Sequence, residues 1–187
     1  MDRHDTIPSS ARGAVGDAAL PSLTLILGGA RSGKSRHAER LVEAAGGGIY
    51  LATAEPGDDE MRQRILDHRA RRGSAWQTVE EPRDLAQALV RAGAAGRPVL
   101  VDCLTLWLSN ILLAGYDLPA ECQALLAALP RIGVPVLLVA NEVGLGIVPD
   151  NALARRFRDT AGRLNQDIAA IADRVLFIAA GLPLVLK

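Results

Sequence analysis

The chain of 187 residues is long enough for one domain with a sizeable core, and its 21 lysines and arginines balance 21 aspartates and glutamates, so the formal net charge is zero. A neutral chain has no global field that attracts polyanions or anionic membranes, which makes nucleic acid a poor candidate partner. The longest strongly apolar stretch, residues 175–186, is shorter than the roughly 20 residues that cross a bilayer, so no membrane span is expected.

The cysteines and the first residues bear on location and domain limits. Cys103 and Cys122 form neither a disulfide framework nor a metal-ligand cluster, which favours a cytoplasmic protein. Residues 1–21 show no apolar periodicity and lack the hydrophobic run of a signal peptide. We expect a flexible N-terminal tail over residues 1–21 and one domain over residues 22–187.

From Leu23 onward, short apolar runs alternate with longer helical segments, an order typical of βαβ units around a parallel sheet. Strands are predicted near residues 23–27, 49–53, 76–79, 98–102, 134–140 and 174–179, and a last run at 184–187 fits an antiparallel edge strand. Helices are predicted near residues 34–45, 59–72, 83–92, 105–114, 119–130 and 149–173, the last with Pro149 in its first turn. Because the strands are continuous apolar runs, we expect an α/β fold whose mostly parallel sheet has helices on both faces.

The clearest motif, GGARSGKS, joins the first predicted strand to the first predicted helix. Glycines let backbone N–H groups turn toward phosphates, Lys34 adds a full positive charge, and the Ser35 hydroxyl can coordinate Mg²⁺. The alternative is a glycine-rich turn without a ligand. We predict a P-loop for a nucleoside triphosphate with Mg²⁺, made of Gly28, Gly29, Ala30, Arg31, Ser32, Gly33, Lys34 and Ser35.

Several acidic residues follow the other predicted strands, at the edge where parallel sheets bind ligands. Asp102 ends a buried run and resembles a Walker-B acid that supports Mg²⁺; the alternative is an N-cap for the next helix. Glu80 fits either a nucleotide contact or the start of a helix. Glu142 fits a solvated loop carboxylate as well as a substrate or metal contact, so it receives no catalytic role.

His68 shares one helical face with Met61 and Ile65, because separations of three, four and seven residues lie on one stripe. Arg69, Arg71 and Arg72 follow it and suit either a phosphate or a helix C-terminus. From spacing alone, packing or capping is the default interpretation of His68, with a nucleophile as the alternative.

Three blocks together carry a family resemblance: GGARSGKSRHAE at residues 28–39, DDEMRQRILDHRARR at 58–72 and NEVGLGIVPDNALARRFRDTAGRLNQ at 141–166. In this order they resemble the bifunctional adenosylcobinamide kinase and adenosylcobinamide-phosphate guanylyltransferase family, over residues 23–187. The resemblance implies a RecA-like P-loop NTPase fold and a homotrimer. It also implies an enzyme of cobalamin biosynthesis that phosphorylates adenosylcobinamide with ATP or GTP. GMP from GTP then reaches that phosphate through a guanylyl-histidine, giving adenosylcobinamide-GDP.

The resemblance also assigns roles to residues of this sequence. His68 stands where the family carries its guanylylated histidine, although this chain has Asp67 where some relatives have a second histidine. The P-loop then binds GTP, and Ser35 and Asp102 are the metal positions. Further nucleotide contacts are implied at Thr53, Ala54, Glu55, Arg69, Ala70, Arg71, Arg72, Glu80 and Asp102. Two other functions stay open: a P-loop kinase of another small molecule, and a RecA-like ATPase that acts as a nucleotide switch.

Overall fold

The computed structural model describes residues 19–55 and 73–187. Most of the predicted tail lies outside these residues. So does the predicted helix 59–72, and with it the site residues predicted from it, namely His68, Arg69, Ala70, Arg71 and Arg72.

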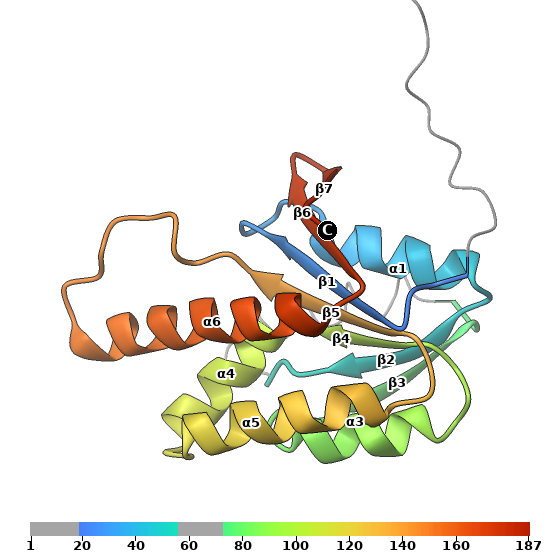
Figure 1. The fold of residues 1–187 in the computed structure, drawn as a ribbon, viewed down its shortest axis with the longest axis horizontal. Coiled ribbons are helices and arrows are strands. Elements are labelled where there is room, and N and C mark those ends of the chain that lie inside the picture. Colours follow the sequence, from blue (N-terminus) through green and yellow to red (C-terminus); the bar gives the residue numbers. More distant parts are fainter. Residues whose placement is uncertain (1–18, 56–72) are drawn as a thin grey trace, which may run out of the picture.

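The described chain forms a seven-stranded sheet in the order β3-β2-β4-β5-β1-β6-β7 (Figure 1). All neighbouring strands are parallel except the last pair, β6 and β7, which are antiparallel. The predicted antiparallel edge strand is therefore confirmed, although it begins two residues earlier than predicted. The strands are β1 (Leu23–Gly28), β2 (Gly48–Ala52), β3 (Trp76–Glu80), β4 (Val99–Asp102), β5 (Val136–Asn141), β6 (Arg174–Ala179) and β7 (Leu182–Val185).

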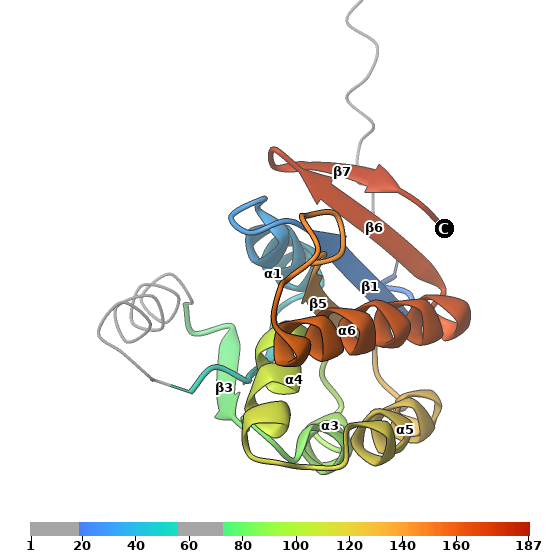
Figure 2. The ribbon, with the colours of Figure 1, turned by 90° about the vertical axis from the view of Figure 1, so that its left-hand side faces the viewer.

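Helices cover both faces of the sheet, as the continuous apolar strands predicted. Helix α1 lies on one face, and α3, α4, α5 and α6 lie on the other (Figure 2). The predicted start of the last helix is wrong, because the side chain of Asn151 caps α6 by accepting a 2.7 Å bond from the Ala154 N–H, and Pro149 precedes that cap. The helices are α1 (Lys34–Ala44), α3 (Leu85–Gly93), α4 (Leu104–Leu113), α5 (Leu118–Ala128), the 3₁₀ helix η1 (Leu129–Arg131) and α6 (Ala152–Ile171).

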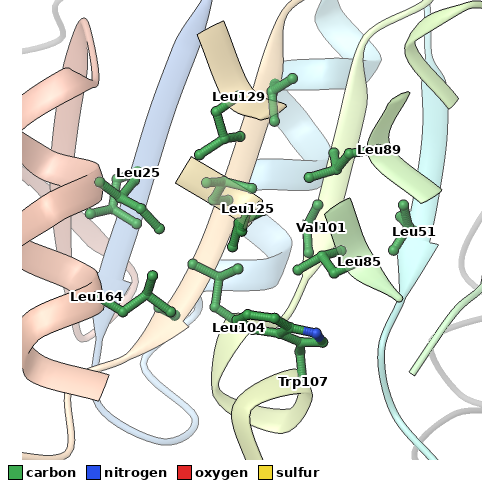
Figure 3. Close-up of a cluster of buried hydrophobic side chains, with 14 of the residues drawn as sticks. Leu25, Leu51, Leu85, Leu89, Val101, Leu104, Trp107, Leu125, Leu129 and Leu164 are labelled. Carbon is green, nitrogen blue, oxygen red and sulfur yellow. The ribbon is translucent and has the colours of Figure 1, made fainter. Parts of the chain in front are cut away.

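Alternate residues of each strand enter two separate cores. Leu25 and Val101 face the larger core, which packs against α3 to α6 around Trp107 (Figure 3). Ile26 and Leu100 face the smaller core beneath α1. Burying a leucine or isoleucine side chain stabilises a fold by roughly 1.5–3 kcal/mol, so both cores stabilise this packing of helices on the sheet. No helix among residues 19–55 and 73–187 is long and apolar enough to span a bilayer.

Parallel pairing brings the strand ends to one edge of the sheet. Ala52 of β2 is in register with both Glu80 and Asp102, and Gly28 of β1 is in register with Asn141. The predicted P-loop therefore shares its edge with the loops after β2, β3, β4 and β5, where open α/β sheets bind their ligands.

Candidate nucleotide-binding site

The loop between β1 and α1 needs glycine at two points. Gly28 has φ 150°, and a Cβ there would lie 2.4 Å from the carbonyl oxygen of Ile178. Gly33 has φ 99°, and its Cβ would lie 3.2 Å from Gly181 Cα. The β6–β7 turn thus packs under the loop, and the Gly181 N–H donates a 2.8 Å bond to the Ser32 carbonyl.

Lys34 is the first residue of α1 and is only 6% exposed. Its Nζ donates a 2.6 Å hydrogen bond to the Gly29 carbonyl, so the ammonium group lies over the loop. Burial lowers the pKa of Lys34, while the negative charge of Asp102 opposes that shift. The first turn of α1 holds no acidic side chain, so its free N–H groups and dipole favour an anion.

Asp102 ends β4 beside this loop and is held in place by Tyr50. The Tyr50 hydroxyl donates a 2.6 Å bond to Asp102 Oδ2. Asp102 does not cap α4, because the N-cap is Cys103 and no side chain of the described residues caps that helix. The structure therefore does not support the capping alternative.

The oxygen donors at this edge fit Mg²⁺ bound together with a triphosphate. Mg²⁺ prefers hard oxygen ligands and commonly uses one or two protein groups plus phosphates and water. The Ser35 hydroxyl, at the start of α1, and the Asp102 carboxylate supply such oxygens. Among the described residues no group of three or more His, Cys, Asp or Glu side chains could hold a metal ion.

Residues 53–55, which follow β2, are held by hydrogen bonds and an ion pair to other parts of the chain. Thr53 is fully buried, and its Oγ1 both donates to the Cys103 carbonyl (2.7 Å) and accepts from the Cys103 N–H (2.8 Å). Ala54 is half-buried, and Glu55 pairs with Arg83 across 3.0 Å. A nucleotide contact by Thr53 stays a prediction, and the structure restricts it to groups other than the engaged hydroxyl.

The structure places the remaining predicted residues at the rim of the same edge. Glu80 is exposed at the end of β3. Glu142 accepts a 2.6 Å bond from the Gly144 N–H, and the backbone N–H of Glu142 donates to the Gly28 carbonyl. Glu142 therefore shapes its own loop next to the P-loop.

Sequence reasoning missed four residues that organise this site. Tyr50 fixes Asp102, and the Thr105 hydroxyl accepts a 2.7 Å bond from the Asn141 N–H. Trp107 and Asn110 hold the loops after β2 and β3. The last two had a signal, because Cys103, Trp107 and Asn110 are four and three residues apart and therefore share one face of a helix.

Known proteins resemble this chain over nearly its whole length. A model of the family described as cobinamide kinase / cobinamide phosphate guanyltransferase matches residues 24–186. The bifunctional adenosylcobalamin biosynthesis protein CobP of Pseudomonas aeruginosa is 54% identical over 166 residues, which are 87% of this chain and 96% of that protein. The bifunctional adenosylcobalamin biosynthesis protein CobU of Salmonella typhimurium is 42% identical over 180 residues, which are 88% of this chain and 99% of that protein.

Solved structures resemble the fold at low identity. An ATPase from the type III secretion system of pathogenic bacteria aligns with a TM-score of 0.55 at 15% identity, covering 89% of this chain and 57% of that one. The P4 protein from bacteriophage phi6 in complex with ADP aligns with a TM-score of 0.50 at 14% identity, covering 98% of this chain and 59% of that one. These likenesses concern the fold alone, and with the observed sheet they confirm the predicted α/β fold of RecA-like type.

Proposed function

This chain belongs to the cobinamide kinase / cobinamide phosphate guanyltransferase family, and from that membership we propose that it catalyses two transfers in cobalamin biosynthesis. It phosphorylates adenosylcobinamide with ATP or GTP, and it then adds GMP from GTP to give adenosylcobinamide-GDP. The observation that carries the proposal is the P-loop at the carboxyl edge of the sheet, with Lys34 buried over it and Asp102 fixed beside it. These groups suit a triphosphate substrate.

The kinase step needs charge neutralisation and positioning. The aminopropanol hydroxyl oxygen of the substrate attacks the γ-phosphorus of ATP or GTP. The bond between this phosphorus and the β–γ bridging oxygen breaks, ADP or GDP leaves, and the hydroxyl proton passes to solvent. Lys34 and the loop N–H groups stabilise the negative charge on the phosphoryl oxygens. Ser35 and Asp102 would hold Mg²⁺, which supplies further positive charge when bound.

The guanylyl step needs a nucleophile, and we propose His68 for it. A neutral imidazole nitrogen attacks the α-phosphorus of GTP and pyrophosphate leaves; an oxygen of the corrinoid phosphate then attacks the same phosphorus and frees the histidine. Arg69, Arg71 and Arg72 follow His68 in the sequence and would offset the charge of both anions.

The surroundings of His37 make it a poorer candidate nucleophile than His68. It lies in α1 two residues after Ser35, but its Nε2 is buried and has no hydrogen-bond partner among the described residues. Burial lowers the pKa of His37, and Arg174 and Arg40 lower it further. The imidazole therefore has little access to a nucleotide from Nε2, which makes His37 a suitable control for His68.

The test uses GTP labelled at the α or the γ phosphate, with adenosylcobinamide as acceptor and intact-protein mass analysis. We expect His68→Ala to lose bound GMP and guanylyl transfer while it still phosphorylates adenosylcobinamide, and His37→Ala to keep both activities. The adduct of the parent protein should be acid-labile and stable in alkali, as a phosphoramidate is. Covalent GMP on His68→Ala, or an equal loss of both activities in that folded variant, contradicts the assignment. If the parent protein transfers the phosphoryl group only to another alcohol, the result favours a kinase of another small molecule. If it only hydrolyses the nucleotide, the result favours the nucleotide switch.

We also propose the homotrimer that the resemblance implies. Three aliphatic side chains of the loop after β5 are strongly exposed, namely Leu145 (82%), Ile147 (98%) and Val148 (64%). Contiguous exposed apolar groups of this kind commonly mark protein contacts. Light scattering should give three times the chain mass of 19.7 kDa, and Ile147→Glu should lower that mass. A parent protein with the mass of one chain would contradict the trimer.

A further inference from the structure

Two polar side chains from neighbouring strands meet on the sheet face that α1 covers. Tyr50 of β2 is in register with Leu100 of β4, and Ala52 is in register with Asp102. Residues two apart on a strand share a face, so all four side chains lie on the face of the smaller core. Ala52 carries only a methyl group, which leaves room for the Tyr50 hydroxyl to reach Asp102 Oδ2 at 2.6 Å.

The ring of Tyr50 is confined by its neighbours. Its side chain is buried in the smaller core beneath α1. The Trp76 ring meets it edge-on, with ring centroids 5.9 Å apart and an interplanar angle of 79°. Trp76 Nε1 in turn donates a 3.1 Å bond to Glu43 Oε1 of α1. A ring that is confined in this way holds its hydroxyl at one place, so the donor that Asp102 meets is preorganised.

The charge of Asp102 also acts on Lys34. It raises the pKa of Lys34 against the larger effect of burial, so the two groups are close enough to attract each other. In the structure each is bonded to a neutral partner, because Lys34 Nζ donates to the Gly29 carbonyl and Asp102 Oδ2 accepts from Tyr50. A direct ion pair would instead occupy the ammonium group that the P-loop offers to phosphates and the carboxylate offered to Mg²⁺.

We propose that Tyr50 is a positioning residue, which orients the Asp102 carboxylate for Mg²⁺ and keeps it apart from Lys34. A short hydrogen bond from a hydroxyl to a carboxylate is one of the stronger kinds. It occupies Oδ2, so Oδ1 is the oxygen left for the metal ion or for one of its waters. Removing a group that holds a metal ligand in place typically changes metal affinity by roughly 10- to 100-fold.

The inference rests on the proposed function and is tested by a Mg²⁺ titration of nucleotide binding to the full chain. The probe is a fluorescent GTP analogue whose α–β bridge is a methylene group, so that guanylyl transfer does not consume it. Tyr50→Phe removes the hydroxyl and keeps the ring contact with Trp76. We expect the Mg²⁺ concentration for half-maximal binding to rise about tenfold or more, while the affinity in EDTA stays within about twofold of the parent value. Tyr116→Phe, which removes the same group from an exposed tyrosine, is the matched control and should change neither value.

A double variant shows whether Tyr50 acts through Asp102. When Asp102→Asn is already present, the further change Tyr50→Phe should raise the half-maximal Mg²⁺ concentration by less than about twofold, because the group that the tyrosine orients has lost its charge. A purely structural role of Tyr50 predicts the same rise in both backgrounds.

Three results overturn the inference. These are a Mg²⁺ titration of Tyr50→Phe within about twofold of the parent, an equal loss of affinity in EDTA, and an equal rise in the presence of Asp102→Asn. If Tyr50→Phe does not yield folded protein, Tyr50→Met, whose flexible side chain fills gaps in a core, is judged by the same criteria.

The titration needs no corrinoid, so failure of the proposed function looks different. A parent protein that binds the analogue with Mg²⁺ but transfers nothing to adenosylcobinamide contradicts the proposed function. A parent protein whose binding of the analogue does not depend on Mg²⁺ contradicts the role of Tyr50.

Discussion

Replacing Gly28 by alanine tests how tightly the phosphate loop is fitted to the end of the sheet. The new Cβ would lie 2.4 Å from the Ile178 carbonyl oxygen and 2.8 Å from Ser32 Oγ, so β6 has to move or the loop has to rise. Overpacking of this kind costs roughly 1–3 kcal/mol. The residue also has φ 150°, and a strained backbone costs about another 1–3 kcal/mol. We expect Gly28→Ala to lower the free energy of unfolding by about 2–6 kcal/mol in total.

The neighbouring glycine provides the control. Among the described residues nothing lies within 4 Å of a Cβ placed at Gly29, so Gly29→Ala should change the free energy of unfolding by less than about 1 kcal/mol. Thermal unfolding followed by circular dichroism separates the two, since the larger change corresponds to a fall in Tm of roughly 5–20 °C for a chain of this size. Equal Tm values for the two variants would refute the reasoning, because both residues belong to the same loop and differ in what surrounds them.

Three further predictions concern the charged and titrating groups of the site. Lys34→Ala should abolish phosphoryl and guanylyl transfer together, because both consume a triphosphate, and full activity in either assay would rule out the P-loop role. Asp102→Asn should raise the Mg²⁺ concentration needed for half-maximal rate while the fold is kept, since charge is lost with almost no volume; an unchanged Mg²⁺ titration would speak against it. Burial and the nearby Asp102 raise the pKa of the Cys103 thiol from 9.0 to about 12, so the native state keeps this proton longer than the unfolded chain. The resulting stability is complete below pH 9 and declines as the pH rises toward 12, and denaturant titrations should show a smaller decline for Cys103→Ala.

The sequence by itself determined the local structure and the phosphate loop. Six parallel strands were predicted to within about two residues. Five of them are apolar runs with burial on both faces, whereas β3 (Trp76–Glu80) is largely exposed. The P-loop was predicted from consecutive residues, because its glycines, Lys34 and Ser35 are neighbours in the sequence. The start of α6 was missed because the Asn151 cap competes with Pro149 as a starting signal.

Only the tertiary structure decided which distant residues complete the site. Tyr50 reaches Asp102, Asn110 reaches Thr53, and Gly181 supports Ser32 because β2 lies beside β4 and β6 lies beside β1. Each of these pairs is 50 or more residues apart in the chain. Local propensity and the hydrophobic period determine where a strand lies in the sequence and which of its faces are buried. Neither determines the order of strands in a sheet, because that order follows from how all the helices and strands pack together.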